Sequence, residues 1–245
     1  MQSARPFAVQ EGAGPQPDTP RKKGVSRFVE LLGRDLGSMF KSGLLALAAC
    51  LPAGLLVCLA LLAESLPLVL LAAAAAGWLT GPAMTGLYDT ILRALRDEPG
   101  NWWHTYRRVW KRSFRSSLLP GIAFTALWSC LLYAWLAAAP AGPLLLSAVC
   151  LTACSLYFWL QSALFENSSA QKLENCLRMA VGFLPRTLAA VAVQLLYLFI
   201  LPRLGFFGLL TGLWLPSLIA LMIVYPPLEH ALDLEAKIRQ AQTNR

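Results

Sequence analysis

SGLLALAACLPAGLLVCLALLA, residues 42–63, is a run of 22 residues without a charged side chain. A helix needs about 20 predominantly apolar residues to cross the roughly 30 Å hydrocarbon core of a bilayer. The run is therefore long enough for one transmembrane helix. The composition agrees, because 57% of the chain is hydrophobic and only 14% is charged, whereas soluble domains carry about 25% charged residues.

Five more apolar runs follow along the chain. The fifth is the weakest, because Pro185 and Arg186 shorten its inner end, although the long Arg186 side chain can reach the membrane surface. The pattern predicts an all-α protein: a polytopic membrane helical bundle of six transmembrane helices, arranged as three hairpins with cytoplasmic amphipathic helices. The five runs are 66–87, 118–139, 144–165, about 184–201 and 204–225.

The joints between the runs differ in length and charge. Three are tight hairpins that contain one basic residue, Arg203, and the other 20 of the 21 Lys and Arg residues lie in the long joints and the terminal segments. The positive-inside rule then places both termini in the cytoplasm, and it explains the net charge of +8 without nucleic acid. A re-entrant fifth and sixth run would bury Arg203 near the midplane at a cost of about 2.5–3.5 kcal/mol, which favours two full spans.

The segments outside the runs define the domain organisation. Residues 1–25 are polar and rich in Pro and Gly, which predicts a disordered tail. Residues 26–235 form the predicted six-span membrane domain, and residues 236–245 a C-terminal cytoplasmic tail. Apolar residues recur at helical spacing from 28 to 40, which predicts an amphipathic helix on the membrane surface. They recur again from 173 to 184, which predicts a second, cytoplasmic amphipathic helix that starts at residue 168 and has a purely structural role as its alternative.

The second of these helices has a clear start and end in the sequence. Ser168 and Gln171 fit a capping box, and Glu174 and Arg178 are spaced to form an ion pair one turn apart. Pro185 closes the segment.

A glycine-rich stretch marks the inner end of the second run. Gly77, Gly81, Pro82 and Gly86 lie within it, and Pro82 removes a backbone N–H from the helix. One interpretation is a hinge, or a break that faces a substrate, as in transporters with interrupted helices. The other is packing, because pairs of glycines four residues apart let two helices approach closely; Gly208 and Gly212 form such a pair in the sixth run.

The joint between the second and third runs contains an aromatic and basic helix. One side of it is aromatic and the other basic, which suits the headgroup boundary of a membrane with anionic lipids, or an acidic protein partner. The aromatic residues are Trp103, Tyr106, Trp110 and Phe114, and the basic residues are Arg107, Arg108, Lys111, Arg112 and Arg115.

The sequence offers no set of residues for chemistry, so we expect neither an enzyme nor a cofactor or metal site. The six cysteines form no CxxC pair, and five of them lie inside apolar runs, where Cys acts as a small hydrophobic residue. The histidines, His104 and His230, are far apart in sequence. No Asp, Glu, Lys or His lies in the middle of a run, whereas ion-coupled transporters usually place such groups there.

Several motifs together resemble the YesL-like family of bacterial membrane proteins. The resemblance covers about residues 28–235 and departs from the family at Ser113 and Phe114, where an Asn-Trp pair is frequent, and in the long N-terminal tail. The motifs are Gly81-Pro82-Ala83-Met84-Thr85-Gly86-Leu87-Tyr88, Leu92, Arg96-Asp97-Glu98, Trp102-Trp103, Tyr106-Arg107-Arg108-Val109-Trp110-Lys111, Phe165-Glu166-Asn167-Ser168, Leu173-Glu174-Asn175, Phe183-Leu184-Pro185-Arg186-Thr187-Leu188 and Leu215-Pro216-Ser217-Leu218-Ile219-Ala220-Leu221.

This resemblance implies a six-span protein of the bacterial plasma membrane without an established activity. Members of the family are often associated with carbohydrate uptake, so the resemblance implies an accessory or scaffold component that contacts transporter subunits. The alternative is a stand-alone transporter (permease) for a small solute, which the glycine-rich break favours. The family carries no catalytic residues that could be transferred to this chain.

Overall fold

The described part of the chain consists of helices joined by short turns. The computed structural model describes residues 24–98, 101–165 and 168–243, and within these ranges it contains seven helices and no β-strand. The all-α prediction is confirmed, whereas the predicted tail at 1–25 lies almost wholly outside the described residues. The helices are α1 (Val25–Leu62), α2 (Leu66–Leu95), α3 (Trp102–Leu136), α4 (Ala141–Leu164), α5 (Ser169–Gly182), α6 (Leu184–Thr211) and α7 (Trp214–Thr243).

Five helices, α1, α2, α3, α4 and α6, are long and apolar enough to cross a membrane. Five of the six predicted runs lie in these helices, so the chain fits a multi-pass membrane protein. The sixth run, 204–225, is divided between the end of α6 and the start of α7. The division itself is a turn over residues 212–213. Gly205 kinks α6 near the start of the run, because its φ of 54° and ψ of −131° are not helical, and the nearby Pro202 lacks a backbone N–H.

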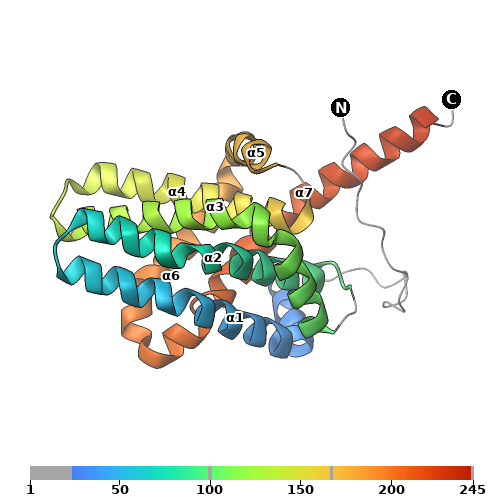
Figure 1. The fold of residues 1–245 in the computed structure, drawn as a ribbon. Helices are drawn as coiled ribbons and strands as arrows, with labels where there is room; N and C mark the ends of the chain where they lie inside the picture. The colour runs from blue at the N-terminus through green and yellow to red at the C-terminus, as the bar shows by residue number, and fades with distance from the viewer. Residues whose placement is uncertain (1–23, 99–100, 166–167, 244–245) are drawn as a thin grey trace.

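Two of the turns between long helices, α1–α2 and α3–α4, lie at the same end of the molecule. Figure 1 shows the α1–α2 turn and the α3–α4 turn together at the left-hand end, and the α2–α3 joint at the opposite end. The joint between α6 and α7 lies below the bundle instead. In the same view α5 is seen end-on, so its axis runs across the bundle, and α7 leaves the bundle at the upper right.

The predicted amphipathic segments before the first and third runs are not separate helices. Residues 28–40 continue without interruption into the apolar part of α1, and residues 102–115 continue into α3. The reason is that no proline or positive-φ residue stands at either junction, so helical hydrogen bonding carries on. Pro120 follows shortly after the second junction, and Figure 1 shows the first part of α3 turning away from the rest.

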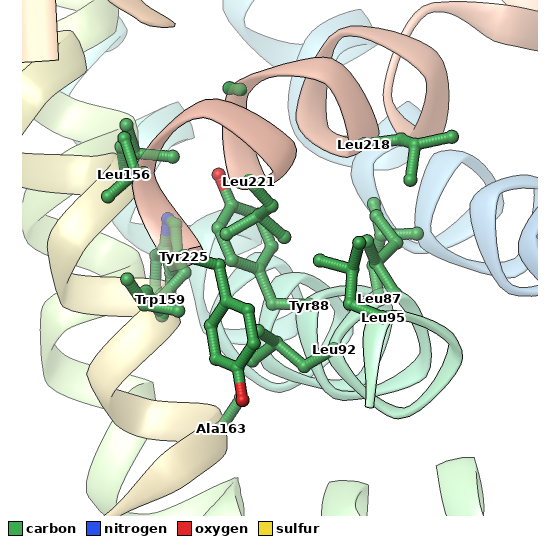
Figure 2. Close-up of a cluster of buried hydrophobic side chains, with 14 of the residues drawn as sticks. Leu87, Tyr88, Leu92, Leu95, Leu156, Trp159, Ala163, Leu218, Leu221 and Tyr225 are labelled. Atoms are coloured by element: carbon green, nitrogen blue, oxygen red, sulfur yellow. The ribbon is translucent and has the colours of Figure 1, made fainter. Parts of the chain in front are cut away.

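α2 is the most enclosed helix of the bundle. Its second half, residues 81–95, is almost entirely buried, whereas its first half is largely exposed. Figure 2 shows the core that results, where side chains of α2, α4 and α7 meet. The side chains labelled there are Leu87, Tyr88, Leu92 and Leu95 from α2, Leu156, Trp159 and Ala163 from α4, and Leu218, Leu221 and Tyr225 from α7.

Candidate functional site

The glycines of α2 face α3 at very short range. A Cβ atom built on Gly81 would lie 2.0 Å from the carbonyl oxygen of Ser117, and one built on Gly77 would lie 2.8 Å from the Cα atom of Ile122. On the opposite helix, a Cβ atom on Gly121 would lie 2.7 Å from the backbone nitrogen of Gly81. Backbone therefore packs on backbone where α2 and α3 cross, which only glycine allows.

The proline and the last glycine of the motif lie in the same interface. Pro82 has no N–H to donate within α2, and Ala83, next to it, accepts a hydrogen bond on its carbonyl oxygen from the Tyr106 hydroxyl of α3, at 3.3 Å. The ring of Tyr106 lies against Gly86, where a Cβ atom would come within 2.7 Å of it. The stretch from Gly77 to Gly86 is therefore covered by α3.

The aromatic and basic side chains of α3 do not occupy two simple opposite faces. Tyr106 is buried and Trp110 is half-buried against the bundle, whereas Trp103 is 49% exposed. The predicted aromatic side is therefore partly a packing surface. The basic side chains are all exposed and form what we call the basic face of α3: Arg107, Arg108, Lys111, Arg112 and Arg115.

The basic face of α3 is available for a negatively charged partner. Within the described part of the chain, Arg107, Lys111 and Arg115 form no ion pair with a carboxylate. The face ends where the apolar run of α3 begins at residue 118, so at about 1.5 Å per residue Arg115 lies within one helical turn of the hydrocarbon.

A group of ion pairs joins α1 to the end of α2. One Arg27 nitrogen donates to both carboxylate oxygens of Asp97, at 2.8 and 2.7 Å, and Arg34 donates to the same carboxylate. The side chains of Arg27 and Asp97 are only 9% and 11% exposed. The same arginines donate to the carbonyl oxygens of Leu95 and Ala94 in the last turn of α2, where the Ala94 carbonyl oxygen also accepts from the Asp97 backbone N–H at 3.2 Å.

A small polar cavity lies beside these ion pairs. Its volume is about 40 Å³, which is room for a few water molecules, whereas sites for small molecules usually measure about 300–1,000 Å³. The cavity is therefore too small for a sugar or a comparable solute. Its lining comes from α1, α2, α3 and the segment that follows α2: Asp35, Ser38, Met39, Thr90, Arg93, Ala94, Glu98, Trp102 and Thr105.

The start of α5 has the predicted geometry. The Ser168 hydroxyl accepts from the Gln171 backbone N–H at 3.3 Å, and the Gln171 side-chain oxygen accepts from the Ser168 N–H at 3.2 Å, so the capping box is confirmed. The predicted ion pair is also present, with 2.6 Å between Arg178 and Glu174.

The buried face of α5 is polar, which the sequence pattern did not indicate. Lys172 is 2% exposed and Cys176 is fully buried. The Lys172 ammonium donates to the Ser162 hydroxyl of α4 at 3.3 Å. The Gln161 amide of α4 donates to the Lys172 carbonyl oxygen and to the Cys176 sulfur. These hydrogen bonds join α5 to α4, and Cys176, Met179 and Ala180 add apolar contacts with the core, whereas the leucines of α5 do not.

No protein-family model, curated protein or solved structure matches this chain.

Proposed function

We propose that this chain is an accessory or scaffold component of a membrane transport system, with carbohydrate uptake as the process that the YesL-like resemblance suggests. The observation that carries this proposal is the α2–α3 crossing. A transporter would use the break at Gly81 and Pro82 as an opening toward its substrate, whereas here α3 backbone fills it. The exposed basic face of α3 supplies a surface for a partner instead.

The proposal includes six spans with both termini in the cytoplasm. The charge distribution supports this orientation, since the tight hairpins hold a single basic residue. The start of α7 would complete the sixth span together with the short helical piece after Gly205. Single cysteines placed at Glu64 or Arg203 test the arrangement. A membrane-impermeant reagent added from the outer side should label both positions.

Copurification tests the accessory role. The chain is extracted from native membranes in mild detergent, captured, and its companions are identified by mass spectrometry. Stoichiometric recovery of transporter subunits is the expected result, and a capture from cells that express an unrelated multi-pass protein serves as the control. If the purified chain moves solute into liposomes by itself, the accessory role is wrong.

A stand-alone transporter is the second candidate, and the break in α6 favours it. Gly205 interrupts the helix, and the Tyr197 hydroxyl contacts Thr211 across the break and the Gly208 carbonyl oxygen at 3.4 Å. A positive φ strains any residue except glycine. Under this function, Gly205→Ala abolishes solute uptake in liposomes and leaves the amount of protein in the membrane unchanged.

The basic face of α3 is expected to select anionic lipids. Changing Arg107, Arg108 and Lys111 to Gln should lower the preference for spin-labelled phosphatidylglycerol over phosphatidylcholine severalfold for each cation removed, because each cation near the surface contributes about 1 kcal/mol. Electron spin resonance in liposomes measures the preference. Arg178→Gln is the control, since Arg178 is exposed but already paired with Glu174. An unchanged preference in the triple variant would exclude lipid as the partner of this face.

A further inference from the structure

We infer that α5 lies flat in the membrane interface with its leucines inserted among lipid acyl chains. The inference rests on the membrane character of the chain and not on its accessory role. It assigns an occupant to an apolar surface that the bundle leaves uncovered. That surface, called here the apolar stripe of α5, consists of Leu173, Leu177, Val181 and Leu184, which are 55%, 66%, 65% and 50% exposed.

Both ends of α5 lie at the boundary between polar and apolar parts of the long helices. At its start, the Ser169 hydroxyl donates to the Ser116 carbonyl oxygen of α3 at 3.0 Å, and the apolar run of α3 begins two residues later. That carbonyl is free because Pro120, four residues on, has no N–H. At its end, α5 passes into the apolar part of α6 at Leu184.

An element with both ends at the same depth runs parallel to the membrane. Figure 1 agrees, because α5 is viewed along its axis while the long helices cross the page. Its 14 residues extend about 20 Å at 1.5 Å per residue. The whole length of α5 is therefore held at the boundary rather than only one end.

Three different surfaces follow one another around α5. Lys172 and Cys176 point into the bundle. Glu174 and Arg178 are 63% and 73% exposed and form the charged surface. At 100° per residue, the apolar stripe falls between these two surfaces, which is the side that faces the membrane when the charged surface faces water.

The apolar stripe is continuous with surface that a membrane would cover. Leu184 at the start of α6 belongs to it, and the exposed Leu188 follows one turn further along the same helix. Exposed Arg186 lies between them in sequence and can extend to the headgroups. Lipid, and not a second protein, therefore accounts for the stripe, since the apolar surface extends beyond α5 along a helix long enough to span.

Spin-label accessibility in liposomes tests the inference. Single cysteines are introduced as Leu177→Cys and Val181→Cys, with Glu174→Cys and Arg178→Cys as matched controls, in a chain that keeps only Cys176, which is buried. Labels at 177 and 181 should collide severalfold more with oxygen than with a water-soluble nickel chelate, and labels at 174 and 178 should show the reverse. Equal nickel accessibility at all four positions would overturn the inference.

Two further outcomes are decisive, and the second of them needs no variant. A label at 177 that is shielded from both reagents would mean that protein covers the stripe, which contradicts the inference. The unmodified chain in liposomes can also be labelled with a photoactivated lipid-soluble diazirine and mapped by mass spectrometry. Adducts on Leu173, Leu177 or Val181 support the inference, and their absence while residues of α6 are labelled overturns it.

Discussion

Gly81→Ala is expected to lower the stability of the bundle by about 3 kcal/mol, the upper end of the usual cost of overpacking. The new Cβ atom would lie 2.0 Å from the carbonyl oxygen of Ser117 and 2.8 Å from its carbonyl carbon. Both are backbone atoms, so no side-chain rotation can relieve the contact. α2 and α3 must separate, and the close packing around Gly121 is lost with them. Unfolding in mixed micelles with increasing SDS measures the change.

Substitutions at two other glycines serve as comparisons for Gly81→Ala. Gly54→Ala serves as the matched control, because no atom lies within 4 Å of a Cβ at that position, and alanine should leave the stability of α1 equal or slightly higher. Gly86→Ala should fall between the two, since its nearest atoms belong to the Tyr106 ring, a side chain that can shift. If Gly81→Ala unfolds like Gly54→Ala, the α2–α3 crossing is not as close as described.

The sequence predicts the apolar helices well because a span depends on length and composition, which are local properties. Five of six runs lie in helices of spanning length. The kink of α6 in the sixth run depends on the positive φ of Gly205. Glycine can adopt several backbone conformations, and the neighbouring residues do not determine which one it takes. The continuity of α1 and α3 was missed for a related reason, since a change from polar to apolar composition does not end a helix.

The sequence does not predict which residues contact each other between helices. The GxxxG spacing singled out Gly77 and Gly81, yet their counterpart Gly121 has no such spacing. Ser169 was visible only as a polar residue near a helix start, and its role at the open carbonyl of Ser116 requires α5 and α3 to be side by side. The apolar spacing predicts the helix α5, but the apolar residues Leu173, Leu177 and Val181 of this helix face outward, whereas Lys172 is buried.

Asp97→Asn is expected to destabilise the bundle by about 3 kcal/mol at neutral pH, because it removes the counter-charge of an arginine that is almost buried. Arg27 is 9% exposed on its side chain. Asn is a suitable test because Asp97 has a φ of 60°, and Asn tolerates this region as Asp does. The substitution therefore removes the charge and keeps the backbone and one acceptor oxygen.

Glu174→Gln is the matched control for this variant. It breaks the pair with Arg178, whose side chains are 73% and 63% exposed, and such surface pairs contribute about 0.5 kcal/mol or less. Thermal unfolding in detergent, followed by size-exclusion chromatography, compares the two variants with the unchanged chain. Equal effects of Asp97→Asn and Glu174→Gln would mean that the group of ion pairs between α1 and α2 does not hold the helices together.

The pH dependence distinguishes the charge of Asp97 from other effects of the substitution. Burial alone would raise the pKa of this carboxyl group, but the hydrogen bonds and charges of Arg27 and Arg34 outweigh it, so the pKa lies below its usual value. Because the pKa is lower in the folded state, the Asp97 carboxylate stabilises the bundle fully at pH values above the pKa of about 3.9 that the group has in the unfolded chain. This contribution is lost as the pH falls through the folded-state pKa. The stability difference between the unchanged chain and Asp97→Asn should therefore be constant from pH 7 to about pH 5 and shrink below about pH 4. A difference as large at pH 3 as at pH 7 would assign the effect to the amide group rather than to the missing charge.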